Sequence, residues 1–95
     1  MRWKIEIDPA AERELDKLDP QSARRVLKYL HERVASLEDP RSIGKPLKGP
    51  QFGEFWRYRV GDYRIIVRIE DNVLLMMVLR IASRKNVYKG SSPLR

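Results

Sequence analysis

The amino-acid sequence predicts an α+β domain in which a helical hairpin covers one face of a largely antiparallel sheet. An alternating strand pattern opens the chain, and two helical patterns that each begin at an Asp-Pro dipeptide follow it. Three β-rich runs joined by turn dipeptides fill most of the second half. Ninety-five residues suffice for one modest core, so residues 1–95 are expected to form a single domain with the order β-α-α-β-β-β.

The first three elements follow from short local signals. Apolar and polar residues alternate over residues 3–7, which predicts a short strand with one buried face. Asp8-Pro9 then begins a helix, because aspartate accepts hydrogen bonds from free backbone N–H groups and proline presets the first helical φ. Asp19-Pro20 begins a second helix in the same way, and its apolar face runs over residues 23–37.

The sheet continues after a basic loop. Residues 39–53 are rich in proline and glycine and carry Lys45 and Lys48, which indicates a loop. Runs at 55–60, 63–69 and 73–81 then predict a three-stranded antiparallel meander, with turns at the dipeptides Gly61-Asp62 and Asp71-Asn72.

The last of these runs is apolar on both faces, which is typical of a central strand covered on both sides. The polar tail that follows is expected to form a short helix and then to fray over residues 91–95.

Charge and composition exclude several function classes. Residues 1–40 carry a net charge of −1 and residues 41–95 a net charge of +8, which favours a polyanionic partner. Without cysteine and with one histidine, the chain offers no disulfide and no cysteine or multi-histidine metal site, so we expect neither metal nor cofactor. No stretch approaches the roughly 18 apolar residues of a membrane span, so we expect a cytoplasmic protein with no membrane partner.

Arginines gather on one face of the predicted meander. A two-residue turn at Gly61-Asp62 makes Arg59 the direct partner of Arg64, and period-two alternation puts Arg57 and Arg68 on the same face. The opposite, core side then holds Trp56, Tyr58, Val60, Tyr63, Ile65, Val67 and Ile69.

Two arginines in direct opposition repel by about 0.2–1 kcal/mol, and an anion lying between them offsets that cost. A guanidinium fork also matches two phosphate oxygens. The alternative is a solvated face whose arginine stems cover apolar neighbours. Near the end of the chain, one helical turn would set Arg84 and Tyr88 on one side, next to Lys85. Tyr88 could there donate a proton, stack on a base, or simply pack the tail.

Residues 55–66 (FWRYRVGDYRII) and 83–88 (SRKNVY) resemble the RelE/ParE toxin superfamily. The resemblance extends over nearly the whole chain, including the opening strand, the helical hairpin and the loop at residues 45–49. RelE-type members cut mRNA in the A site of the 30S ribosomal subunit, and ParE-type members poison DNA gyrase. The basic sheet favours a RelE-type endoribonuclease. The alternatives are a ParE-like gyrase inhibitor without nuclease activity and a nucleic-acid-binding module without catalysis.

The resemblance also implies roles for single residues. The mRNA 2′-OH attacks the adjacent phosphate, and the residues implied in catalysis are Arg59, Arg64, Arg84 and Tyr88. Those implied in RNA binding are Arg57, Arg68, Lys45, Lys48 and Lys85. Many relatives carry lysine on the second strand or histidine before the late arginine, where this chain has Arg57, Arg59 and Ser83. Arginine is a poor base, so Tyr88, a ribosomal or mRNA group, and a transiently neutral Arg59 are the candidates for accepting the 2′-OH proton.

A toxin of this type implies a partner that neutralises it. The resemblance implies a RelB-like antitoxin that wraps the domain with an acidic or amphipathic segment, giving a toxin-antitoxin hetero-oligomer. The +8 charge over residues 41–95 would attract such a segment as well as RNA.

Overall fold

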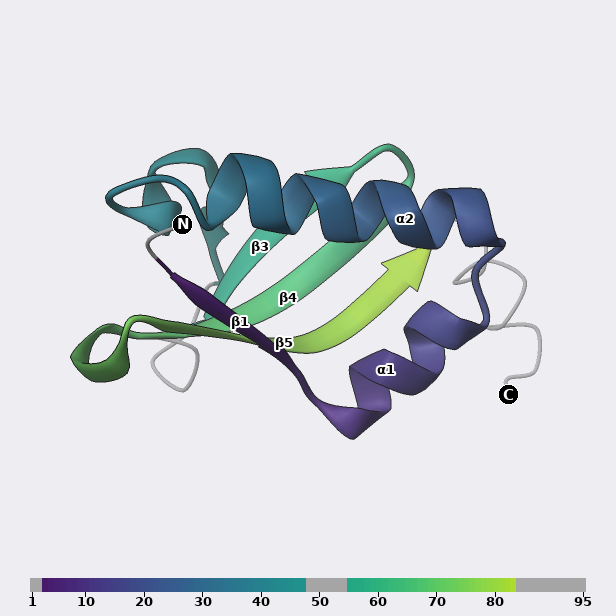
Figure 1. Ribbon diagram of the computed structural model, residues 1–95, viewed down its shortest axis with the longest axis horizontal. Helices are drawn as coiled ribbons and strands as arrows, with labels where there is room; N and C mark the ends of the chain where they lie inside the picture. Colours follow the sequence, from purple (N-terminus) through teal and green to yellow (C-terminus); the bar gives the residue numbers. More distant parts are fainter. Residues whose placement is uncertain (1–2, 48–54, 84–95) are drawn as a thin grey trace.

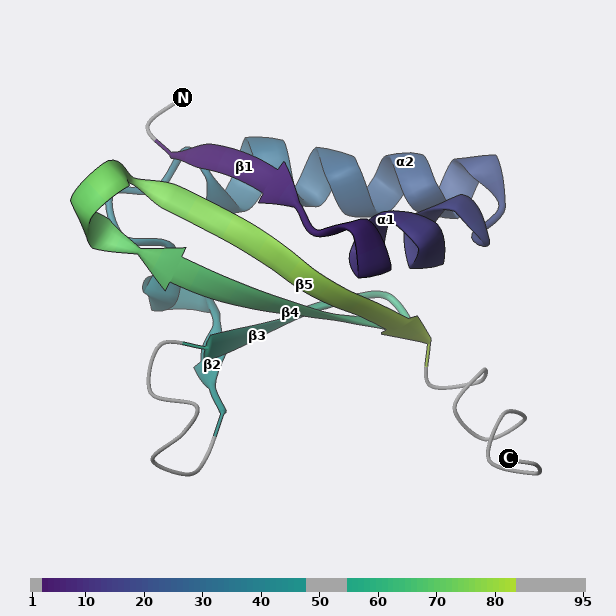
Figure 2. The same ribbon diagram turned by 90° about the horizontal axis from the view of Figure 1, so that it is seen from below.

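The computed structural model describes residues 3–47 and 55–83, and it confirms the α+β architecture. Five strands form one sheet in the order β1-β5-β4-β3-β2, with β1 parallel to β5 and the other pairs antiparallel. The helices lie together on one side of this twisted sheet (Figure 1 and Figure 2). The strands are β1 (Lys4–Ile7), β2 (Lys45–Pro46), β3 (Phe55–Val60), β4 (Tyr63–Glu70) and β5 (Leu75–Ser83).

Both helices of the hairpin begin at their expected caps. A carboxylate oxygen of Asp8 accepts from the N–H of Ala10 at 3.0 Å and begins α1 (Pro9–Asp16). Asp19 accepts from the N–H of Ser22 at 3.1 Å and begins α2 (Pro20–Lys28).

The second helix does not stay α-helical to residue 37. A π-helical segment, η1 (Tyr29–Val34), continues α2, and the N–H of Ala35 donates to the carbonyl of Leu30, five residues back, at 2.8 Å. Leu30 and Val34 remain fully buried in this wider turn, so core packing is kept through the change of helix type.

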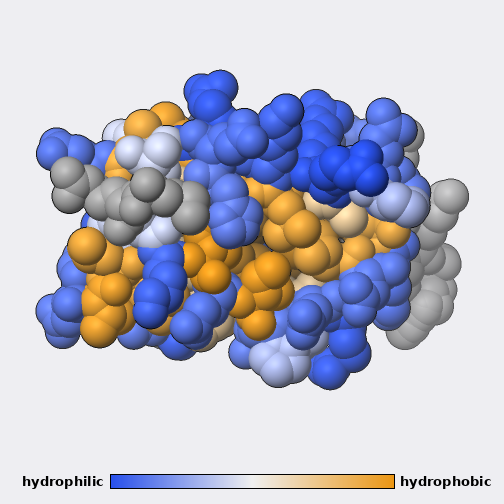
Figure 3. Space-filling model, viewed as in Figure 1, coloured by the Kyte–Doolittle hydropathy of each residue, from blue (hydrophilic) through white to orange (hydrophobic). Residues whose placement is uncertain are grey.

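The core lies between the sheet and the helices, as the alternation of apolar residues predicts. The buried residues of the meander come from the expected side, and Trp56 and Tyr63 pack against them half-buried. At the edge of the core Trp3 is buried, and its Nε1–H donates to the carbonyl of Glu38 at 3.2 Å. Apolar surface emerges between α2 and the β1–α1 segment (Figure 3). Ile7 and Leu27 pack against the core and are half-buried.

The register of β3 and β4 is the predicted one. Val60 pairs with Tyr63, Arg59 with Arg64, and Phe55 with Arg68. Gly61 adopts a φ of +59°, as a tight hairpin turn requires.

The second turn differs from the expected two-residue form. A 3-10 turn, η4 (Asp71–Val73), is closed by Leu74 in the left-handed conformation (φ 48°), and β5 starts at Leu75 instead of residue 73. The extra turn residues place Val73 and Leu74 outside the sheet, where they are 60% and 41% exposed.

The segment expected to be a loop is partly ordered into regular structure. A 3-10 turn, η2 (Pro40–Ile43), precedes β2, and Asp39 caps it by accepting from the N–H of Arg41 at 3.1 Å. Lys45 and Pro46 pair with β3, which adds a two-residue strand to the three expected in the meander. Proline is tolerated there because β2 lies at the edge of the sheet. Lys48 lies outside the described residues.

The expectation that β5 is covered on both sides is wrong for the described part of the chain. β5 is an interior strand of the sheet, between β1 and β4, but α1 and α2 lie on one side of it only (Figure 2). On the other side Leu75, Met77 and Leu79 are half-buried. An irregularity opposite Ile66 and Val67 shifts the β4–β5 register, which accounts for the break in alternation along β5.

Two further expectations fall partly or wholly beyond these ranges. The short C-terminal helix and the fraying of residues 91–95 lie outside the described residues. Among residues 3–47 and 55–83, no helix is long and apolar enough to cross a membrane.

Candidate anion-binding site

Four cations meet on the sheet face that points away from the helices. Arg59 and Arg64 are direct partners across β3 and β4, and both are exposed. Lys45 is the direct partner of Arg57 across β2 and β3. Paired residues share a face, so the short edge strand brings a fourth cation to the expected arginine face.

These four cations line one hollow of about 290 Å³, together with Tyr29 and Ile43. Among residues 3–47 and 55–83, no carboxylate lines it. The ion pairs between described residues involve Arg41, Arg68 and Arg80, and none of the four cations of the hollow. Like charges gathered without a counter-ion destabilise the site, and a bound anion relieves that repulsion. The hollow is therefore suited to an anion with several oxygens, such as a phosphate.

The buried side chain of Tyr58 fixes the position of the edge strand β2 next to these arginines. Its side chain is 1% exposed, and its hydroxyl donates to the carbonyl of Pro40 at 2.7 Å. Burial raises the pKa of Tyr58, so the phenol stays neutral at physiological pH. Gly44 lies against the same ring, and a Cβ there would come within 2.8 Å of it. The turn that leads to Lys45 is thus fixed by a buried hydrogen bond and a close ring contact.

Arg68 shares the face of the other three arginines but is not brought to the hollow. Its Nε donates to a carboxylate oxygen of Glu70, two residues along the same strand, at 3.0 Å. Arg68 lies opposite Phe55, the first residue of β3, so its cross-strand partner is not a cation. Its assignment to RNA binding stays a prediction.

Arg41 and Arg80 form ion pairs that join distant segments of the fold. The guanidinium of Arg41 binds both carboxylate oxygens of Asp71, at 3.1 and 2.7 Å, and also contacts Asp39 at 3.2 Å. The hydrogen bond with Asp71 is the main reason that the pKa of Arg41 is raised, and it lowers the pKa of that carboxyl. Arg41 also lies 6.0 Å from the ring centre of Trp56.

Glu14 makes a contact that the sequence analysis did not identify. One carboxylate oxygen accepts from Nε and Nη2 of Arg80, at 3.0 and 2.8 Å, and the other accepts from the N–H of Ile81 at 2.6 Å. β1 ends opposite Val78, and Ile81 lies beyond that point on β5. There Glu14 accepts the hydrogen bond of the Ile81 N–H in place of a strand. The hydrogen bond with Glu14 is the largest cause of the raised pKa of Arg80.

The remaining predicted site residues cannot be placed relative to the hollow. Lys48, Arg84, Lys85 and Tyr88 all lie outside the described residues. In the described ranges, no group of three or more histidine, cysteine, aspartate or glutamate side chains is arranged to hold a metal ion.

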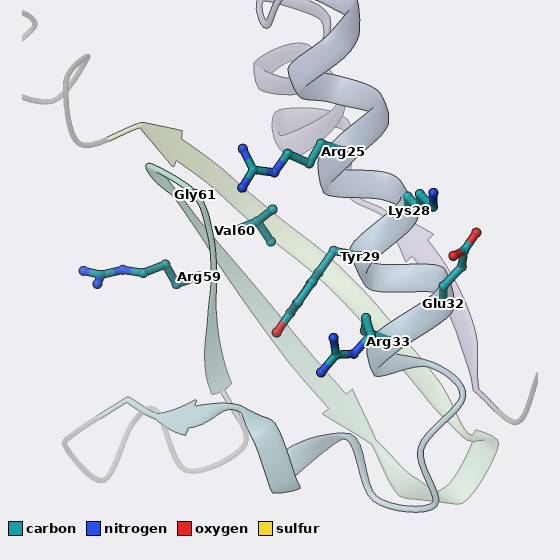
Figure 4. A pocket seen from close by; sticks show the side chains of 8 residues that line it. All are labelled: Arg25, Lys28, Tyr29, Glu32, Arg33, Arg59, Val60 and Gly61. Carbon is teal, nitrogen blue, oxygen red and sulfur yellow. The ribbon is translucent and has the colours of Figure 1, made fainter.

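A second, larger hollow of about 480 Å³ lies between α2 with its π-helical extension and the end of β3. Figure 4 shows Arg25, Tyr29 and Arg33 projecting from the helix on the side that faces β3. The sequence analysis did not single out these residues. Their four-residue spacing was the signal that could have found them, because it puts all three on one helical face.

Comparison with known proteins agrees with this architecture. The model of a family described as the ParE toxin of the type II toxin-antitoxin system parDE matches residues 5–88. The toxin RelG of Mycobacterium tuberculosis is 29% identical over 89 residues, which cover 94% of this chain and 99% of that protein.

Solved structures with the same fold include toxins both in complex and alone. The toxin-antitoxin complex RelBE2 of Mycobacterium tuberculosis contains a chain that is 26% identical, with a TM-score of 0.77 over 88% of this chain and 93% of that one. The isolated Escherichia coli toxin RelE is 19% identical, with a TM-score of 0.68 over 95% of each chain. In the archaeal RelE–RelB complex of Pyrococcus horikoshii the values are 24% and 0.66, over 88% of this chain and 97% of that one. At these last two identities the likeness concerns the fold alone.

Proposed function

The chain belongs to the ParE toxin family of type II toxin-antitoxin systems, within the RelE/ParE superfamily, and from this premise we propose that it is a RelE-type endoribonuclease that cuts mRNA in the ribosomal A site. The observation that carries the proposal is the hollow lined by Lys45, Arg57, Arg59 and Arg64, to which no described residue adds a carboxylate. Four cations without acidic partners are suited to a phosphodiester that gains charge during reaction.

The proposed chemistry is an intramolecular transfer on the substrate. The mRNA 2′-oxygen forms a bond to the adjacent phosphorus and loses its proton, while the bond from phosphorus to the 5′-oxygen breaks and that oxygen gains a proton. The products are a 2′,3′-cyclic phosphate and a free 5′-OH. Since the nucleophile belongs to the RNA, the protein has to orient the strand and stabilise the pentavalent phosphorane.

Within this proposal, Arg59 and Arg64 contact the reacting phosphate from opposite strands, since they are direct partners in the sheet. Arg57 and Lys45 form a second cation pair one step along the sheet and bind the adjoining backbone. Arg84 and Tyr88 are assigned to the phosphate and to base stacking or leaving-group protonation, on the strength of the motif at residues 83–88. The candidates for accepting the 2′-OH proton are Tyr88, a neutral Arg59, and groups of the ribosome or mRNA.

The partners proposed for this chain are the ribosome, mRNA and a RelB-like antitoxin. The similar structure RelBE2 of Mycobacterium tuberculosis, at 26% identity, is a toxin-antitoxin complex, which supports an antitoxin here. Action on ribosomes places the proposed activity in the cytoplasm. In the toxin-antitoxin hetero-oligomer, an acidic segment of the antitoxin would compete with RNA for the basic face.

A second candidate is inhibition of DNA gyrase without RNA cleavage, and the match to the ParE family model favours it. The two candidates differ in what the arginine face does. A gyrase inhibitor tolerates loss of the opposed arginines, whereas a nuclease does not.

Primer extension on mRNA-programmed ribosomes tests the proposal. Purified protein should cut within the A-site codon, and free mRNA without ribosomes serves as the comparison. Arg59→Ala and Arg64→Ala should each slow cleavage by about 10²–10³-fold, the usual cost of losing one preorganised donor to the transition state. The matched control is Arg24→Ala, which removes an exposed arginine of α2 that lines neither hollow.

The expected result is A-site cleavage by the wild type and the control, with slow cleavage by the two sheet variants. If both sheet variants cut mRNA as fast as the wild type, Arg59 and Arg64 do not belong to the active site. Intact mRNA in every lane would refute the nuclease, and inhibition of gyrase supercoiling by the same protein would then establish the second candidate.

A further inference from the structure

The second hollow combines an aromatic ring with cations. Arg25, Tyr29 and Arg33 form a stripe at four-residue intervals, and this stripe faces the end of β3, where Figure 4 shows Val60 turned toward the helix and Arg59 turned away from it. Along this helix the tyrosine lies between the two arginines of the stripe, four residues from each. Tyr29 is half-buried and packs against the core at its base.

The positive charge of the stripe is not neutralised within the described chain. Arg25, Arg33 and Arg59 take part in none of the ion pairs between described residues. Glu32 is the single carboxylate among the described residues that line the hollow, and Figure 4 shows it beside Lys28, on the side of the helix turned away from β3. The side of the helix that faces β3 is therefore cationic.

The turn between β3 and β4 makes room for one of these cations. A Cβ added to Gly61 would lie 3.1 Å from Nη1 of Arg25, so this guanidinium rests directly on the turn. Figure 4 shows it pointing from the helix toward Gly61. Helix and hairpin thus hold the charge in a defined place at one end of the hollow.

The two hollows adjoin at the edge of the sheet, because Tyr29 and Arg59 line both of them. β2 pairs only with Trp56 and Arg57, so the edge of β3 beyond that point is uncovered by another described strand. A flexible chain can therefore pass from the arginine face over this edge into the hollow beside α2.

We propose that the hollow beside α2 binds the single-stranded RNA segment that adjoins the cleaved phosphate. Tyr29 offers its ring to a base, and Arg25 and Arg33 contact phosphates on either side of it. This inference rests on the proposed nuclease function, and it extends the RNA path by a second subsite.

Single-stranded RNA fits this lining better than an acidic peptide does. Proteins that bind single strands place aromatic rings between cations, because every base has a face on which it can stack. Acidic side chains would pair with the arginines but would leave the ring without a matching partner. The hollow also adjoins a site suited to phosphodiesters, so one strand of RNA can reach both.

Fluorescence anisotropy with a short labelled single-stranded RNA, measured over a salt series, tests the inference. Loss of two phosphate contacts in Arg25→Ala/Arg33→Ala should reduce the magnitude of the log–log salt slope by about 1.4, at roughly 0.7 per single-strand phosphate. The control Arg13→Ala/Arg24→Ala removes the same charge from exposed helix positions outside the hollow, and it should leave the slope near that of the wild type.

Stacking is tested separately at Tyr29. Tyr29→Leu should weaken RNA binding roughly 5- to 150-fold, the equivalent of about 1–3 kcal/mol of base stacking. Tyr29→Phe keeps the ring and should bind like the wild type. Thermal melts of all variants identify any that fail to fold, and the arginine pair tests the same hollow without touching the core.

Cleavage on programmed ribosomes separates this inference from the function on which it rests. The double variant should raise KM and leave kcat nearly unchanged, since its arginines lie away from the reacting phosphate. Wild-type protein that cuts no mRNA refutes the nuclease, whereas cleavage with unchanged KM, RNA affinity and salt slope in the double variant refutes this inference alone. A double variant that keeps RNA affinity but no longer binds a glutamate-rich peptide would identify a protein-docking site and also refute it.

Discussion

Tyr58→Phe is expected to destabilise the protein through one buried hydrogen bond. The phenol is 1% exposed, and its hydroxyl donates to the carbonyl of Pro40, itself buried, at 2.7 Å. The variant fills the same space but removes this hydrogen bond, while the carbonyl keeps the backbone bond of its 3-10 turn. A net hydrogen bond contributes about 0.5–1.5 kcal/mol, so we expect the free energy of unfolding to fall by about 1 kcal/mol. For a domain of this size, the melting temperature should drop by roughly 4–8 °C.

The same phenol predicts a dependence on alkaline pH. Burial raises the pKa of Tyr58 above its usual value of 10.0 in the folded protein, while the unfolded chain keeps the usual value. The contribution of the neutral phenol is therefore fully present below pH 10 and is lost as the pH rises, because only the unfolded state then ionises. Thermal melts above pH 10 should show a steeper loss of stability in the wild type than in Tyr58→Phe.

Tyr63→Phe is the matched control. Tyr63 is half-buried, and its hydroxyl has no hydrogen bond among the described residues. Its loss should change the free energy of unfolding by less than about 0.5 kcal/mol. If Tyr58→Phe melts within a degree or so of the wild type, or no lower than Tyr63→Phe, the buried bond does not hold the η2 turn in place and the reasoning is wrong.

Three more changes test contacts around the sheet. Gly44→Ala places a Cβ 2.8 Å from the ring of the same buried tyrosine and should cost about 1–3 kcal/mol in denaturant unfolding; an unchanged midpoint would contradict it. Asp71→Asn removes a carboxylate whose pKa Arg41 lowers, so the stabilisation is present above the usual pKa of 3.8 and lost as pH falls. Its melting temperature should lie below that of the wild type at pH 7 and converge with it in acid; a difference that persists in acid would exclude this mechanism. Glu14→Ala should cost about 1–2 kcal/mol, against about 0.5 for the exposed Glu12→Ala, and equal costs would show that the edge of β5 does not depend on it.

Much of this fold was accessible from local patterns. The Asp-Pro dipeptides identified both helix starts, since a capping carboxylate and a preset φ act within one turn of chain. The Gly61-Asp62 turn was enough to pair Arg59 with Arg64, because side chains alternate between faces once the turn length is known. The prediction of an arginine face opposite the core follows from the same periodicity.

Contacts between distant segments were decided only by the tertiary structure. The parallel pairing of β1 with β5 joins the first and last strands of the described chain, and it leaves Ile81 at an edge that Glu14 satisfies. The ion pair of Arg41 with Asp71, which lies 30 residues further along the chain, likewise forms only because the fold brings the two segments together.

The second hollow shows the same division. Helical spacing aligns Arg25 with Tyr29 on one face, but only the packing of α2 across the sheet brings that face to the free edge of β3. Sequence patterns report periodicity over a few residues, where backbone geometry decides the outcome. A site assembled from a helix, an edge strand and a hairpin depends instead on how the core orients these elements, and that is a property of the whole chain.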